Sequence, residues 1–192
     1  MQVTHGTIQP GGGPVALTIG NFDGVHRGHR AMLERLVQMA RQLALPCSFL
    51  TFEPHPREFF ATANPRAGSN EPPTRLTRLR EKLELIAETG VDRVHVLRFD
   101  ARLAALAADR FVEDVLLRGL GVRWLLVGRD FRFGARRAGD FAALQSAAEK
   151  RGFILEAMQD VMEGGERVSS SAVRGALASG DLAGAARLLG RA

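Results

Sequence analysis

Two histidines stand three residues apart in the stretch GNFDGVHRGH, which covers residues 20–29 and follows the apolar run 15–19. At the start of a helix, His26 and His29 would lie on one face and point toward one ligand. The free N–H groups and positive dipole end of such a helix start favour a phosphate group. Imidazole adds N–H donors for phosphate oxygens, and the glycines of the stretch permit tight turns. The stretch therefore predicts a phosphate-binding turn.

Other interpretations of these two histidines stay open. Each alone could be a surface or helix-capping residue. The pair could also bind zinc if His55 or an aspartate completed the site. The sequence contains neither the G-x-x-x-x-G-K-[ST] loop nor the G-x-G-x-x-G fingerprint, which excludes those two kinds of phosphate-binding loop.

The elements that must position this turn alternate between strand and helix. Short apolar runs predict five strands, at 15–19, 47–52, 93–99, 124–128 and 153–158. Helical periodicity predicts helices at 28–43, 76–86, 109–121 and 140–152, followed by two short helices at 169–180 and 181–190. This alternation predicts an α/β fold, a Rossmann-like three-layer domain with a mostly parallel five-stranded sheet.

The same pattern predicts the organisation of the chain. Residues 1–14 are expected to be an N-terminal tail or edge segment, and 15–190 to form the domain. The stretch 54–73 is rich in Pro, Asn and Gly and is expected to be a long loop, disordered or acting as a lid.

Ligands of parallel α/β sheets bind at the carboxyl ends of the strands, near a switch in strand order. Four unusual segments follow strands at that edge: GNFDGVHRGH, EPHP, GRDFRFG and RVSSS. Their convergence predicts a single site built from several loops.

Composition bounds the class of protein. The chain has 192 residues, no apolar stretch long enough for a membrane span and no signal-peptide pattern, so a cytoplasmic location without membrane partners is expected. The single cysteine, Cys47, excludes a disulfide framework and a cysteine-based zinc site. The 26 Lys and Arg against 21 Asp and Glu favour an anionic ligand. The cluster RLTRLREK at 75–82 alternates with acids and is expected to be a solvated helix face.

Five stretches together resemble one family. In order, TIGNFDGVHRGH, TFEPHPREFF, VGRDFRFG, AGDF and ERVSSSAVR look like the motifs of the FMN adenylyltransferase (FAD synthetase) module of bacterial bifunctional riboflavin kinase/FMN adenylyltransferase, in the HxGH nucleotidylyltransferase superfamily. The resemblance runs from about Val15 to Arg191. It departs from the family at Ser171, where Thr is usual, and after LLGRA, where the family's riboflavin kinase domain is absent from this chain.

The resemblance implies an enzyme of FAD biosynthesis that converts ATP and FMN to FAD and pyrophosphate with Mg²⁺. The FMN phosphate would attack the α-phosphate of ATP in line, and no protein nucleophile is needed. Riboflavin kinase activity is expected only if a C-terminal kinase domain is present in the full-length protein.

The resemblance also implies roles for residues. The catalytic candidates are His26, His29, Arg167 and Ser170. The candidates for ATP binding are Gly20, Phe22, Asp23, Gly24, His26, His29, Arg167, Ser170, Ser171 and Arg174. Phe22 could instead be a core anchor, Asp23 a turn or N-cap residue, and the serine run a simple N-cap.

The flavin ring is expected to meet flat or apolar side chains and a hydrogen-bond acceptor. The candidates are Phe52, Pro54, Pro56, Phe60, Asp130 and Phe133, and the metal ligands stay unknown. Because Phe131 and Phe133 alternate with charged residues, one of them could equally lie in the core.

Two rival functions remain. A sister nucleotidylyltransferase acting on pantetheine phosphate or nicotinamide mononucleotide would share H-x-G-H but not TFEPHP with GRDFRFG. A nucleic-acid-binding protein would explain the basic charge. Nucleic acid is nevertheless not an expected partner, because the arginines form no sustained run and only 6% of the residues are aromatic.

Overall fold

The computed structural model describes residues 1–8, 11, 13–63 and 72–192. Six strands form one sheet in the order β1-β4-β3-β2-β5-β6, and every neighbouring pair is parallel. The strands are β1 (Gln2–Gly6), β2 (Val15–Ile19), β3 (Cys47–Glu53), β4 (Arg93–Arg98), β5 (Val122–Gly128) and β6 (Ile154–Met158). The predicted three-layer α/β fold is therefore confirmed.

The prediction of five strands is wrong, because β1 adds a sixth strand at the edge, where it pairs with β4. As an edge strand it pairs with a neighbour on one side only, and none of its residues is fully buried. Its sequence QVTHG carries polar residues instead of a continuous apolar run. The pattern that reveals a strand buried on both faces is therefore missing from it.

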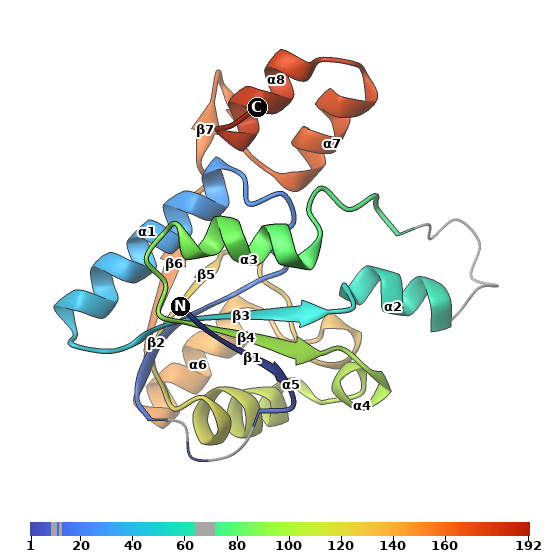
Figure 1. The fold of residues 1–192 in the computed structure, drawn as a ribbon. Coiled ribbons are helices and arrows are strands. Elements are labelled where there is room, and N and C mark those ends of the chain that lie inside the picture. Colours follow the sequence, from blue (N-terminus) through green and yellow to red (C-terminus); the bar gives the residue numbers. More distant parts are fainter. Residues whose placement is uncertain (9–10, 12, 64–71) are drawn as a thin grey trace.

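Helices cover both faces of the sheet (Figure 1). On one face lie α1 (Arg27–Gln42) and α3 (Leu79–Ala87), whose buried side chains join a core around Phe49 and Trp124. On the other lie α5 (Ala108–Arg110), its continuation in the π-helix η1 (Phe111–Gly119), and α6 (Phe141–Arg151), which pack around Leu125 and Val127. The apolar periodicity that predicted the helices marks the faces that are buried here.

The C-terminal segment forms a small unit above these layers. It contains the hairpin β7 (Met162–Glu163) and β8 (Glu166–Arg167) and the helices α7 (Ser170–Ala178) and α8 (Leu182–Leu189). Figure 1 shows this unit above α1 and α3. Its core, built on Val168, Val173 and Leu188, also includes Leu76 from the segment before α3. The unit is therefore tied to the rest of the fold close to residues 20–29, which carry His26 and His29 and are called the histidine turn below.

The expected long loop 54–73 is partly helical, because α2 covers Pro56–Ala63. Proline is well tolerated at the first helical position, and Glu58 in the first turn suits the helix dipole. Residues 64–71, on which the rest of that expectation falls, lie outside the described residues. Two short helices not predicted as separate elements are α4 (Ala101–Ala104) and η2 (Ala135–Arg137).

The strand order places the predicted site. From β2 the chain moves to β3 and β4 on one side, and later to β5 and β6 on the other, so the order switches next to the carboxyl end of β2. The histidine turn begins at this switch point. Within the described residues, no helix is long and apolar enough to cross a membrane.

Candidate active site

The two histidines lie side by side at the start of α1. His26 is the N-cap, and its Nδ1 accepts a hydrogen bond of 3.3 Å from the backbone N–H of His29. The two rings stack with centroids 3.6 Å apart. Because Nδ1 acts as an acceptor, a neutral His26 carries its proton on Nε2, which is left as a donor.

Both imidazoles are held neutral. Burial lowers the pKa of His26 to about 4, against an opposing effect of its backbone hydrogen bond and of Asp23. Burial and the neighbouring His26 and Lys82 also lower the pKa of His29 well below its usual value. At neutral pH the pair therefore offers N–H donors without a full charge.

This neutrality predicts that acid destabilises the protein. Between pH 6.5 and about 4, His26 of the unfolded chain binds a proton that the folded protein does not accept, so stability falls as the pH falls. From pH 7 to pH 5 we expect His26 to contribute a loss of about 2 kcal/mol in the free energy of unfolding. Urea unfolding of the protein and of His26→Gln at both pH values measures it. An equal pH dependence in the two proteins would contradict the assignment.

Phe22 supports the histidine pair from below. Its ring stacks on His29 with centroids 4.2 Å apart and packs on Phe49 at 4.5 Å. Only 4% of Phe22 is exposed, so the core-anchor interpretation describes its position. A Cβ on Gly20 would lie 2.6 Å from this ring, so glycine is required there for the aromatic support to fit.

Asp23 joins three segments of the chain. Its buried carboxylate accepts hydrogen bonds from the backbone N–H groups of Leu76 and Thr77, both at 3.0 Å, and binds the guanidinium of Arg174. The Ser170 hydroxyl donates to the Asp23 carbonyl at 2.8 Å. Asp23 therefore holds the histidine turn, the segment before α3 and helix α7 together, and its oxygens already have partners in the protein.

The three serines at residues 169–171 make different contacts. Ser169 caps α7 by accepting a hydrogen bond from the Ala172 N–H, whereas Ser170 reaches the histidine turn. Ser171 is exposed. The plain N-cap interpretation is thus correct for Ser169, while Ser170 connects two of the predicted phosphate-binding segments.

Arg167 connects the C-terminal unit to the loop after β5. Its guanidinium pairs with Asp130 at 2.8 Å and with Asp160 at 2.9 Å. About half or more of each of these three side chains is exposed. Predicted residues of two different groups, Arg167 and Asp130, are therefore brought into direct contact.

Two further cations of this region were not singled out from the sequence. Arg191 donates to the carbonyls of Gly24 at 2.8 Å and Val25 at 3.3 Å, and so fixes the turn from the C-terminal side. Gly24 has a φ of +85°, which favours glycine. No local pattern marks Arg191, which lies just after α8.

Lys82 is the second of these cations, and the prediction of a solvated face for 75–82 is wrong at this residue. Lys82 is 5% exposed. It lies three residues after Leu79 and four before Ile86, so the helical repeat places it on the face of α3 that packs on the sheet. That spacing is the signal that could have identified it.

The segment after β3 is held by a charge cluster. Arg75 forms a two-pronged ion pair with Glu53, at 2.7 and 3.1 Å, and also binds Glu58 in α2. Pro54 and Pro56 follow Glu53, and Pro54 is exposed whereas Pro56 begins α2. The cluster therefore fixes where α2 and its aromatic side chains start.

Aromatic rings gather at the ends of β3 and β4. Phe99 contacts Phe52, Phe59 and Phe60 edge to face, with centroids 5.4 to 5.9 Å apart. Phe60 is 53% exposed, which is unusual for a ring of this size. The cluster presents an apolar surface that can take a planar ring.

Phe133 does not lie on that surface. It is 6% exposed and packs in the core against Phe111 at 5.7 Å and Phe131 at 5.7 Å. Of the two alternating rings, Phe133 is therefore the one that lies in the core, where the loop folds back through its pairing with Gly139. Phe131 is the more exposed member of this pair.

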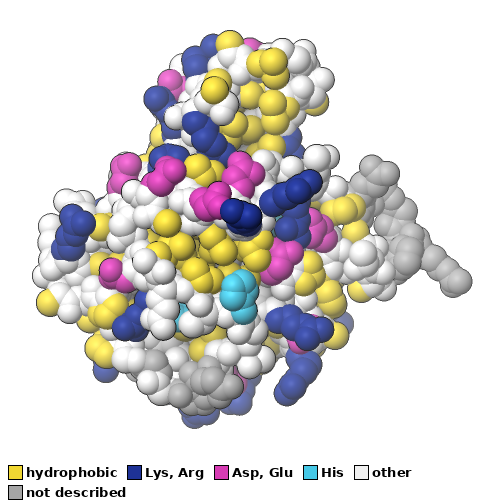
Figure 2. Space-filling view, viewed as in Figure 1, with side chains coloured by type: hydrophobic (Ala, Val, Ile, Leu, Met, Phe, Trp, Pro, Cys, Tyr) yellow, Lys and Arg dark blue, Asp and Glu magenta, His cyan; other side chains and the backbone are white. Residues whose placement is uncertain are grey.

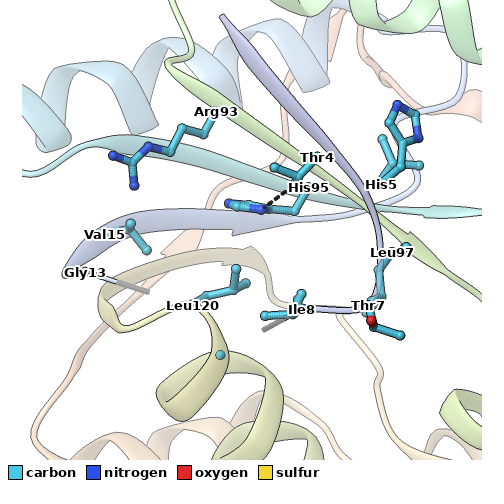
Figure 3. Close-up of a pocket in the computed structure, with 13 residues that line it drawn as sticks. Thr4, His5, Thr7, Ile8, Gly13, Val15, Arg93, His95, Leu97 and Leu120 are labelled. Carbon is cyan, nitrogen blue, oxygen red and sulfur yellow. Dashed lines mark hydrogen bonds between the residues drawn. The ribbon is translucent and has the colours of Figure 1, made fainter. Parts of the chain in front are cut away.

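The described residues contain no group of three or more His, Cys, Asp or Glu side chains that could hold a metal ion. The zinc interpretation therefore has no ligand set in that part of the chain. A cavity of about 560 Å³ lies elsewhere, between β1, β4 and the end of η1 (Figure 3). It is lined by residues such as Thr4, His95 and Leu120 and includes none of the predicted site residues.

Comparison with known proteins confirms the family that the sequence motifs resemble. Residues 10–172 match the family described as FAD synthetase. The chain is 54% identical over 174 residues to the bifunctional riboflavin kinase/FMN adenylyltransferase of Escherichia coli (strain K12), covering 91% of this chain and 53% of that protein. It is 47% identical over 193 residues to the Pseudomonas fluorescens protein of the same name, covering 100% and 60%. The chain thus spans about half the length of the curated relatives it matches.

One solved structure shows the same fold. It is named as a macrolide-efflux protein from Streptococcus pneumoniae and superposes with a TM-score of 0.80 over 100% of this chain and 62% of that one. At 22% identity, the likeness extends to the fold alone.

Proposed function

Because the chain belongs to the FAD synthetase family, we propose that it transfers the adenylyl group of ATP to FMN and releases FAD and pyrophosphate. The observation that carries this proposal is the pair of neutral, stacked imidazoles at the N-terminus of α1, directly at the switch in strand order. An N–H-rich, positively polarised helix start is suited to phosphate. A cytoplasmic location stays a prediction.

In the proposed mechanism, an oxygen of the FMN phosphate forms a bond to the α-phosphorus of ATP. The bond from that phosphorus to the bridging oxygen breaks, and its electron pair leaves with pyrophosphate. His26, through Nε2–H, and His29 bind the α-phosphate and stabilise its developing charge, as expected for preorganised donors in phosphoryl transfer. No group of the protein forms a covalent intermediate.

The triphosphate would extend from the histidines toward the C-terminal unit. Arg167 and Ser171 are exposed, and Ser170 and Arg174 of the same segment bind Asp23 in the histidine turn. In this proposal Arg167 exchanges its carboxylate partners for phosphate oxygens. Asp23, Gly20, Phe22 and Gly24 act by holding the turn in shape.

The flavin would lie on the aromatic surface at the ends of β3 and β4. Phe52 and Phe60, with Pro54 and Pro56 at the start of α2, provide its apolar contacts, and Asp130 offers an acceptor for a ring N–H. Phe133 acts from the core, beneath Phe131.

Mg²⁺ would arrive bound to ATP. The ion is commonly held by substrate phosphates with one or two carboxylates and several waters. Among the described residues, no three His, Cys, Asp or Glu side chains come together in a way that could hold a metal ion. The ion would supply charge neutralisation on the phosphates, and the residues above position them.

The experiment that tests the function incubates the protein with ATP, Mg²⁺ and FMN, and in parallel with riboflavin, and separates the flavins by chromatography. We expect FAD from FMN and nothing from riboflavin, because residues 10–172 match the FAD synthetase family and the chain covers 53% of the bifunctional relative. Adenylylation of pantetheine phosphate or nicotinamide mononucleotide instead of FMN would favour a sister transferase. A riboflavin kinase domain is the proposed partner in the full-length protein.

The charge of the surface agrees with a small anionic substrate. The net charge is +5, yet on the face that Figure 2 shows the Lys and Arg side chains are scattered among Asp and Glu and form no continuous basic surface. A basic stripe is the usual footprint of nucleic-acid binding.

A further inference from the structure

Lys82 is a buried cation on the sheet-facing side of α3. The chain has two lysines, Lys82 and Lys150, and only Lys150 is exposed. The Lys82 ammonium donates to the backbone carbonyl of Asn21 at 2.6 Å, which is its one hydrogen bond among the described residues. Within that same part of the chain, no carboxylate lies within 4 Å of it as an ion-pair partner.

Such an arrangement is unfavourable for folding. An ammonium has three donors and a full charge, and removing it from water is costly unless the charge is paired. An aliphatic side chain of the same length would pack on the sheet without that penalty. A buried, incompletely paired cation therefore indicates a functional group.

The surroundings of Lys82 place it between the two substrate-binding regions. Through Asn21 it contacts the histidine turn, directly before Phe22. Its charge lowers the pKa of His29 and the pKa of His55, which lies in the segment after β3. The charged groups around it are Asp23, Glu53, Glu58 and Arg75.

The phosphate of FMN that attacks ATP is expected to lie between these same two regions. In the proposed reaction it joins the α-phosphate at the histidines to a flavin on the aromatic surface. Two phosphate groups that approach each other repel, and a cation between them offsets that repulsion. A compact ammonium with free donors fits such a position.

We propose that Lys82 binds the phosphate group of FMN and steers it toward the α-phosphate of ATP. Its two remaining N–H groups donate to the phosphate oxygens, while the bond to the Asn21 carbonyl keeps the ammonium in place. This inference rests on the proposed function and adds to it the residue that recognises the attacking phosphate.

The test compares Lys82→Met with the control Lys150→Met. We expect Lys82→Met to lower kcat/KM for FMN about 100-fold, with the KM for ATP nearly unchanged. We expect its Tm to equal or exceed that of the unaltered protein, because a buried charge is removed. Lys150→Met should behave as the unaltered protein. Lys82→Gln, whose amide can still donate to Asn21, gives the same comparison if the methionine variant does not fold.

Flavin binding separates recognition of the phosphate from a structural role. We expect Lys82→Met to weaken FMN binding and to leave binding of riboflavin, which lacks the phosphate, unchanged. Equal weakening of FMN and riboflavin, or unchanged FAD formation, would overturn the proposal. Failure of the unaltered protein to make FAD would contradict the proposed function itself, whereas the ratio of FMN to riboflavin affinity still tests Lys82.

Discussion

Replacing His29 by Ala is expected to lower the rate of FAD formation by about two to three orders of magnitude while the protein still folds. His29 is stacked between Phe22 and His26, and its buried Nδ1 has no hydrogen-bond partner among the described residues. It is therefore held rigidly at the start of α1 with polar capacity left for a ligand. Loss of one preorganised donor to a developing charge has an effect of this size.

The measurement is a steady-state assay of FAD formation at saturating ATP and FMN, with circular dichroism as the check of folding. His5→Ala is the matched control, since His5 is an exposed imidazole on the edge strand β1. We expect the control to keep full activity. Turnover of a folded His29→Ala protein close to that of the control would rule out a role for His29 at the phosphate.

Replacing Asp23 by Asn is expected to lower the free energy of unfolding by about 3 kcal/mol. The substitution keeps the shape but removes the charge that binds Arg174, whose side chain is 21% exposed. An Asn amide can accept the hydrogen bonds from Leu76 and Thr77 only through its single oxygen. Because α7 and the segment before α3 both depend on Asp23, FAD formation should fall as well.

Urea unfolding at pH 7 measures this loss. The matched control is Glu84→Gln, which removes one charge from an exposed ion pair with Arg80 and should change stability by less than about 0.5 kcal/mol. If Asp23→Asn changed the free energy of unfolding no more than the control does, the connecting role of Asp23 would be refuted.

Local pattern was sufficient for the main elements and for the type of chemistry. Strands β2 to β6 and helices α1 and α3 follow periods that each segment carries in itself, because burial on one or both faces selects apolar residues at fixed spacing. The position of the two histidines at the start of α1 was predictable for the same reason. His26 and His29 need only the start of a helix to share a face, and that start is encoded next to them.

What tertiary structure decided is how segments distant in sequence meet. The edge strand β1 forms because β4 offers hydrogen bonds to it, which its own mixed sequence does not reveal. Phe131 and Phe133 both alternate with charged residues, so the sequence does not separate them. Phe133 enters the core because it packs on Phe111 there, and Phe131 remains nearer the surface. Likewise, Asp23 has Arg174 as its partner 151 residues further along the chain.

The sequence by itself therefore determined the α/β architecture and the placement of the histidine pair at a helix start. Both depend on interactions between residues a few positions apart. Only the tertiary structure decided which charges are buried, which are paired and which remain available to a ligand. Lys82 and Arg191 show this most clearly, because the free energy of a charge depends on its whole surroundings, and those are brought together by folding.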